Sequence, residues 1–171
     1  VKILTRRYTK YLVVRRVFET PSQSLYDPEK EIWTLSGGTE DLTFYQRLKK
    51  DNILAMPCIN GSSADMNRKD FERIKPYVAK DEAGGLQLHP YSDQPGRLLS
   101  MCVSQAPWQD EVEKSTDDIT KQYGVAGIYI DQGSGLFHEL CFDQSHLHPL
   151  GGGSYWTRGN RDLLQKVKNV A

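Results

Sequence analysis

The amino-acid sequence predicts an α/β fold built from parallel βαβ units, and two observations carry this prediction. Short apolar runs of strand length alternate along the chain with longer segments whose apolar residues recur every three or four positions. The apolar runs end in polar or turn residues, as the strands of a buried parallel sheet do. Because crossovers between parallel strands are right-handed, all strand carboxyl ends should lie at one edge of the sheet.

The N-terminal 40 residues are difficult to assign to elements. Residues 1–18 alternate as strands do, and the basic stretch at 6–16 is typical of an edge strand with a charged outer face. Residues 19–31 have the Pro, Ser and Asp content of a loop. We therefore separate residues 1–40, as strands and a loop of uncertain role, from a domain at residues 41–171.

Three helices are predicted from the spacing of apolar residues. The first covers residues 41–51, the second covers residues 108–124 with Gly124 as its stop, and the last begins at Arg158. The residues expected to face the core from the first two are Leu42, Tyr45, Leu48, Val112, Ile119 and Tyr123.

Three apolar segments are predicted as strands, and the first two are typical of buried strands. The segments are residues 53–60, 98–104 and 126–131. They end at Asn60, Ser104 and Asp131, so parallel pairing would bring these polar residues to the edge at which α/β folds bind ligands.

Charge and composition exclude several classes of protein. The 171 residues include 22 basic and 22 acidic side chains, so the chain lacks the positive field that nucleic-acid binding requires. No apolar run reaches the length of about 18 residues that spans a membrane. The sequence has no Gly-x-Gly-x-x-Gly motif after a strand and no Gly-x4-Gly-Lys-Ser/Thr motif, the two glycine-rich patterns that bind nucleotides. No cofactor is predicted. Nothing indicates a cellular location, and the missing initiator Met suggests that the natural N-terminus lies elsewhere.

Four segments of the chain carry a family resemblance. They are PCING at 57–61, MCVSQAPWQ at 101–109, GIYIDQ at 127–132 and CFDQSHLHPLGGGSYW at 141–156. Together they resemble a poorly characterised family of bacterial glycoside-hydrolase-like (β/α)8 TIM barrels, a domain of unknown function, over about residues 50–170. The resemblance implies a barrel that acts on carbohydrate. A whole barrel needs about 250 residues, so we expect a partial (β/α)8 barrel, a fragment whose exposed edges could self-associate.

Asp131 is the predicted catalytic residue. A carboxylate at a strand end is held rigidly, and glycoside hydrolysis uses a pair of carboxylates. The resemblance implies a nucleophile or general base, whereas a loop-capping Asp is the structural alternative. Asp65, Glu139 and Asp143 are candidates for the partner acid, but we expect the acid on a later strand. We therefore expect the isolated chain to have little or no hydrolytic activity.

A sugar subsite is predicted around Asp131, because sugars stack on aromatic rings and need a few polar partners. Its residues are Asn60, Tyr129, Gln132, His146, His148, Tyr155 and Trp156. The glycines at 151–153 would let the backbone pass close to the ligand. Asn60 could instead close a turn, and Trp108 is expected to begin a helix and pack on the core.

The sequence contains a candidate set of metal ligands, but no metal site is predicted from it. Asp143, His146 and His148 are metal ligands in type, but a His-x-His pair is a weak pattern, and a histidine that bonds sugar or fastens the loop is favoured. The three cysteines include no Cys-x-x-Cys pair, and Cys58 and Cys102 lie in apolar runs as buried hydrophobes do. Three functions remain open: a glycosidase-type barrel, a non-catalytic carbohydrate-binding remnant of a barrel, and a metal-dependent hydrolase.

Overall fold

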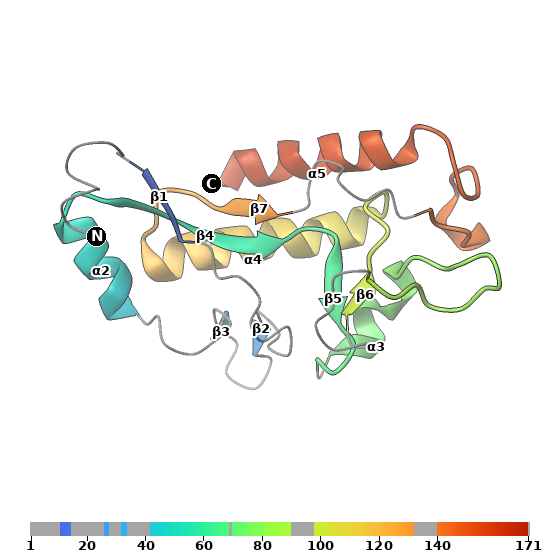
Figure 1. The fold of residues 1–171 in the computed structure, drawn as a ribbon, viewed down its shortest axis with the longest axis horizontal. Helices are drawn as coiled ribbons and strands as arrows, with labels where there is room; N and C mark the ends of the chain where they lie inside the picture. The colour runs from blue at the N-terminus through green and yellow to red at the C-terminus, as the bar shows by residue number, and fades with distance from the viewer. Residues whose placement is uncertain are drawn as a thin grey trace.

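The structure is a computed structural model that describes residues 11–14, 26–27, 32–33, 42–68, 70–89, 98–131 and 140–170 (Figure 1). Its elements in chain order are β1 (Tyr11–Val14), β2 (Tyr26–Asp27), β3 (Ile32–Trp33), α2 (Leu42–Lys50), β4 (Leu54–Asn60), β5 (Ser63–Asp65), α3 (Phe71–Ile74), η1 (Lys75–Tyr77), β6 (Leu98–Ser100), α4 (Ala106–Tyr123), β7 (Tyr129–Asp131), η2 (Gln144–His146) and α5 (Tyr155–Val170).

The largest sheet in the described part of the chain is parallel. Its strand order is β1-β4-β7, and both neighbouring pairs run in the same direction. The crossover from β4 to β7 contains α4, as a βαβ unit requires. Asn60 pairs with Asp131 at the carboxyl ends of β4 and β7, so the predicted meeting of these two residues at one edge is confirmed.

The prediction that residues 98–104 form a strand of the parallel sheet is wrong. Only Leu98–Ser100 is a strand, and β6 pairs antiparallel with β5 outside the parallel sheet. The chain turns just after β4, so that β5 begins three residues beyond Asn60 and becomes the partner of β6. Ser104 therefore lies in the short link before α4 and ends no parallel strand.

The parallel sheet is covered on one face. In β4, the alternate residues Ala55, Pro57 and Ile59 are buried, whereas Leu54 is 37% exposed and Met56 is half-buried. The expectation of a buried strand at residues 53–60 is therefore met on only one face of β4, among its described side chains. Because side chains alternate between the two faces of a strand, the described residues give the sheet one core face and one open, partly apolar face.

The core lies between the parallel sheet and the helices. Figure 1 shows α4 and α5 running alongside β4 and β7, with the β5–β6 pair beyond the end of β4. The predicted inward residues Tyr45, Val112 and Ile119 are buried, and Leu48 and Tyr123 pack against the same core. Leu42 lies in α2, but its side chain is outside the described part. Gly124 ends α4 in the left-handed conformation, as predicted.

Trp108 packs in the core, as predicted. Its ring is buried, and its indole N–H donates to the carbonyl oxygen of Gly61 at 2.9 Å, which ties α4 to the end of β4. None of the helices in the described ranges combines the length and the apolar character needed to cross a membrane.

The last helix, α5, begins three residues before the predicted start at Arg158. This earlier start places Tyr155 and Trp156 in its first turn, where both rings are buried. At Gly159, an added Cβ would lie 2.6 Å from the carbonyl oxygen of Val103, so only glycine allows this close approach.

Candidate functional site

The edge formed by the ends of β4 and β7 contains two of the predicted site residues. Asn60 and Asp131 are neighbours in the parallel register, and Tyr129 lies two residues before Asp131 in β7. The side-chain oxygen of Asn60 accepts hydrogen bonds from the backbone N–H of Ser62 at 2.8 Å and from its hydroxyl at 3.2 Å. Asn60 thus fixes the turn that leads into β5.

Two predicted candidates lie outside the described residues. They are Gln132, assigned to the sugar subsite, and Glu139, considered as the partner acid. Asp65 is described: it is buried at the end of β5, and its carboxylate accepts the backbone N–H of Asn67 at 2.8 Å.

The carboxylate of Asp143 is buried and hydrogen-bonded, and it is not exposed to solvent as most loop acids are. One oxygen lies 2.8 Å from the ammonium of Lys80, and the other accepts from the backbone N–H and the hydroxyl of Ser145. Burial alone would raise the pKa of Asp143, but the bonds from Lys80 and Ser145 outweigh it and hold the pKa well below its usual range. A carboxylate this acidic keeps no proton near neutral pH and cannot act as a general acid.

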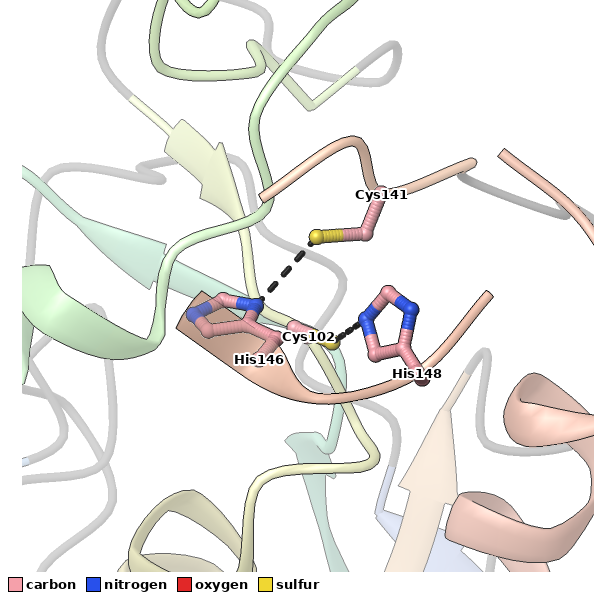
Figure 2. Close-up of side chains that lie close together, drawn as sticks. All are labelled: Cys102, Cys141, His146 and His148. Atoms are coloured by element: carbon pink, nitrogen blue, oxygen red, sulfur yellow. Dashed lines mark hydrogen bonds between the residues drawn. The ribbon is translucent and has the colours of Figure 1, made fainter. Parts of the chain in front are cut away.

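A second constellation, which we call the Cys–His cluster, consists of Cys102, Cys141, His146 and His148. One potential ligand atom from each residue lies within 4.8 Å of those of the other three. Figure 2 shows the four side chains converging, with each sulfur facing one imidazole. The sulfur of Cys102 is 3.3 Å from Nε2 of His148, and the sulfur of Cys141 is 3.3 Å from Nδ1 of His146.

Backbone carbonyl groups orient both imidazoles. Nε2 of His146 lies 2.8 Å from the carbonyl oxygen of Pro76, and Nδ1 of His148 lies 2.9 Å from that of Pro149. A carbonyl only accepts, so each of these nitrogens carries a proton and donates it. In a neutral imidazole the other nitrogen then has a free lone pair, and in both rings that nitrogen faces a sulfur.

Burial and hydrogen bonding shift the pKa values of the two thiols in opposite directions. The hydrogen bond with Cys141, together with burial, raises the pKa of the Cys102 thiol. The hydrogen bond from Cys102 lowers the pKa of Cys141 against the effect of burial, and a further bond with His146 lowers it more. The two sulfurs are too close for both to ionise without a cation beside them.

The loop before α5 turns sharply to bring these residues together. Leu147, between the two histidines, has a φ of 56° and is 93% exposed, so it stands at the outside of the turn. Gly151 also has a positive φ, and its backbone N–H donates to the carbonyl oxygen of Cys141 at 3.0 Å. An added Cβ at Gly151 would lie 2.3 Å from the ring of Phe142, so this glycine is needed to close the loop on itself.

The aromatic residues after the glycines support the cluster. The ring of Tyr155 stacks on His148 with a centroid distance of 3.8 Å and an interplanar angle of 4°. Its hydroxyl oxygen accepts the backbone N–H of Cys141 at 2.7 Å. Trp156 is buried in a small hydrophobic core that also contains Tyr155, Cys102 and Cys141. In this structure, neither ring presents a face to solvent.

Sequence reasoning placed the two histidines in a sugar subsite and did not connect them with the cysteines. Cys102 precedes α4 and Cys141 follows β7, so 38 residues separate the two ligand positions (102 and 141) in the sequence. No short spacing pattern spans such a distance, and the apolar run around Cys102 predicted an ordinary buried thiol. The only sequence pattern at the cluster was Cys-x4-His-x-His from Cys141 to His148.

Comparison with known proteins gives one family match and several relatives. Residues 35–171 match the family described as Domain of unknown function (DUF6259). A Monosiga brevicollis protein with the provisional name glycoside hydrolase 22789 is 33% identical over 140 residues, which cover 77% of this chain. A Bacteroides thetaiotaomicron protein, also provisionally named a glycoside hydrolase, is 25% identical over 114 residues, or 66% of this chain. The chain spans only 12% and 17% of these two relatives.

Solved glycoside hydrolase structures share the fold. A crystal structure of an alpha-xylosidase from a soil metagenome, complexed with xylose, matches 98% of this chain and 24% of its own, with a TM-score of 0.64 and 16% identity. Ega3 of Aspergillus fumigatus, in complex with galactosamine, matches 77% of this chain and 44% of its own, with a TM-score of 0.50 and 14% identity. At these identities the likeness is one of fold.

Proposed function

Because the chain belongs to the DUF6259 family and its curated relatives carry glycoside hydrolase names, we propose that it forms part of a carbohydrate-active barrel that hydrolyses O-glycosyl bonds. One observation carries the proposal: the parallel register sets Asp131 beside Asn60 at the carboxyl edge of the sheet. In barrels and open α/β sheets alike, catalytic residues lie at this edge.

Asp131 is assigned the role of nucleophile or general base. It is the last residue of a strand that is hydrogen-bonded to β4, so its backbone is held in place by the sheet. Such positioning lowers the entropic cost of bringing a carboxylate to the anomeric carbon of a sugar. With a partner carboxyl about 5–5.5 Å away the reaction would retain configuration, and with one about 6.5–9.5 Å away it would invert it.

Sugar contacts are assigned to Tyr129 and Asn60. Because residues alternate between strand faces, positions 129 and 131 belong to the same face of β7. Tyr129 is 36% exposed, and its ring can accept the C–H face of a sugar. Tyr155 and Trp156 are left out because they are buried against protein, and His146 and His148 because both ring nitrogens already face protein atoms.

The general acid is assigned to a later strand of the barrel, with Asp65 and Glu139 as the candidates within this chain. Asp65 follows Asn60 by five residues and is the last residue of β5, the strand that comes directly after β4. The low pKa of Asp143 argues against that residue. A missing acid is consistent with a partial (β/α)8 barrel, as are the three parallel strands among the described residues and the open face of the sheet.

The test combines sugar binding with turnover. Xylose and galactosamine, the sugars bound by the structural neighbours, are titrated into the chain and followed by saturation-transfer NMR. We expect binding that is lost in Asp131→Asn and Tyr129→Ala and kept in Asp162→Asn, a change on the exposed side of α5. p-Nitrophenyl xylosides and galactosides should show little or no turnover by this chain alone.

Two outcomes would count against this function. If neither sugar nor any of the aryl glycosides binds to the folded chain, the carbohydrate assignment is overturned. If the chain does turn over an aryl glycoside and Asp131→Asn keeps the full rate, the assignment of Asp131 is overturned. A rate that disappears in Asp131→Asn would instead support the role of Asp131 and show that the acid lies within this chain.

A further inference from the structure

The structure assigns the Cys–His cluster as a structural zinc site, in which Cys102, Cys141, His146 and His148 bind one Zn²⁺ in a closed tetrahedron. The inference concerns the loop before α5 and does not depend on the proposed hydrolase activity. Its first support is the ligand set, because two cysteines and two histidines are a common donor set of structural zinc sites.

The spacing of the donor atoms fits such an ion. With Zn–S near 2.3 Å and Zn–N near 2.0–2.1 Å, neighbouring donors of a tetrahedral site lie about 3.3–3.8 Å apart. The four donor atoms already lie within 4.8 Å of one another, and both sulfur–nitrogen pairs stand at 3.3 Å. Zinc therefore requires only a small contraction of the cluster.

The outer contacts of both histidines provide a second, independent support. A histidine that binds metal donates its other ring N–H to a carbonyl or carboxylate, which fixes the tautomer and the ring orientation. His146 donates to Pro76 and His148 donates to Pro149, so in each neutral ring the inner nitrogen, which faces a sulfur, is the one that carries the lone pair. The stacked ring of Tyr155 holds His148 in this orientation.

Charge balance favours a divalent ion in this buried position. Cys102, Cys141 and His146 are buried, and His148 is half-buried. On binding, the two thiols release their protons to solvent, and two thiolates with one Zn²⁺ have no net charge. Asp143 is already neutralised by Lys80, so it does not compete as a ligand. A neutral site avoids the cost of a buried net charge.

Four protein ligands leave no position for a water molecule, so the site is structural and not hydrolytic. Cys102 lies in the link between β6 and α4, and Cys141 lies shortly before η2. The two histidines lie at the end of η2 and just after it. Zinc would therefore fasten the loop before α5 to the segment that follows β6 of the β5–β6 pair. The metal-free alternative is a pair of Cys–His hydrogen bonds.

The experiment measures metal directly in the full chain of 171 residues, purified under reducing conditions. Zinc is quantified by mass spectrometry and removed with a chelator, and cobalt(II) chloride is then added as a spectroscopic probe. We expect about one zinc per chain and, with cobalt, the visible bands of a tetrahedral ion and a thiolate charge-transfer band. The thermal midpoint of the chain should fall when the chelator is added.

Variants distinguish residues that bind the metal from residues that only stabilise the loop. Cys141→Ser and His148→Asn should lose the zinc. His148→Cys keeps four ligands and should retain one metal with a stronger charge-transfer band. Ser104→Ala is the matched control: its hydroxyl lies 3.0 Å from the sulfur of Cys102, but it is not a ligand, and its metal content should be unchanged.

A chain that takes up no stoichiometric zinc, whether it is folded or not, overturns the assignment. So does an octahedral cobalt spectrum, or equal metal content in Cys141→Ser and Ser104→Ala. None of these measurements involves a sugar, so failure of the zinc site and failure of the proposed hydrolase function are distinguished.

Discussion

Gly159 in α5 has no side chain, and this lets the helix approach the segment before α4 closely. An added Cβ would lie 2.6 Å from the carbonyl oxygen of Val103 and 2.8 Å from the backbone nitrogen of Ser104. Both atoms belong to the backbone, so they cannot move aside as a flexible side chain would. We expect Gly159→Ala to lower the free energy of unfolding by about 1 to 3 kcal/mol, despite the better helix propensity of alanine.

Denaturant unfolding checks this prediction, and Gly152→Ala is its matched control. No atom lies within 4 Å of the position that a Cβ would take at Gly152, and its φ is not in the left-handed region. The free energy of unfolding of the control should therefore be unchanged. Equal stability of Gly159→Ala and the parent chain would show that α5 can move outward without loss of packing.

At the scale of elements, a network of charged side chains joins α3 to α4. The guanidinium group of Arg68 pairs with Asp70 and with Glu111, and Arg73 pairs with the same two carboxylates. Arg68 is 6% exposed at its side chain, so the carboxylates around it are needed to balance a buried charge. The network fixes a short helix of four residues that has little stability of its own.

The network predicts a pH dependence of stability. Burial alone would raise the pKa of Asp70, but hydrogen bonds from Arg68 and Arg73 hold it below the ordinary value. Since the folded pKa lies below the unfolded one, the stabilisation is present above the unfolded pKa and is lost as pH falls below about 4. We expect Asp70→Asn to cost about 1 kcal/mol at neutral pH and to weaken the acid dependence.

Unfolding measured from neutral pH to pH 3 tests this prediction. Asp162→Asn is the control, because the side chain of Asp162 is half exposed and its carboxylate pairs with the guanidinium group of the neighbouring Arg161, whose side chain is exposed as well. Its unfolding curve should follow that of the parent chain at every pH. If Asp70→Asn also follows the parent at every pH, the carboxylate contributes nothing to the junction of α3 and α4.

Elements with a strong local pattern could be predicted from sequence. The apolar spacing and Gly124 predicted α4, and the apolar run ending at Asn60 predicted β4. The pairing of β6 could not be predicted, because a short apolar run does not encode which strand it will pair with or in which direction. That choice depends on the turn after Asn60, which delivers β5 as the partner.

In the part of the chain that the structure describes, one face of the main sheet is open, and this exposure predicts self-association. Leu54 and Tyr129 are both more than a third exposed there. Exposed apolar area of this kind favours contact with another apolar surface. We expect the chain to elute above its monomer mass of 19.5 kDa in size-exclusion chromatography, and Leu54→Glu to shift it toward the monomer.

Leu164→Glu is the control for this experiment. Leu164 is 41% exposed and belongs to α5 and not to the sheet, so a charge there should leave the elution volume unchanged. Hydrogen exchange of β4 should also be faster in Leu54→Glu than in the self-associated parent chain. A chain that elutes as a monomer with a protected β4 would contradict the prediction.

The candidate site was predicted only in part. The end of β7 could be located because the strand is local, and the family resemblance then directed attention to Asp131. The Cys–His cluster could not be assembled, because Cys102 is brought to the other three residues by the packing of α5 against the segment at residues 103–104. Contacts between distant segments depend on the whole fold and leave no periodic pattern in the sequence.

The wide separation of Cys102 and Cys141 has a topological consequence. These two residues lie on either side of α4 and β7, so a metal bound between them closes a ring that contains the proposed catalytic strand. A peptide bond cut anywhere within that ring would leave one continuous molecule, since the two pieces would still be joined through the ion. In the metal-loaded protein, the part of the chain that carries Asp131 could thus be nicked by a protease without being released.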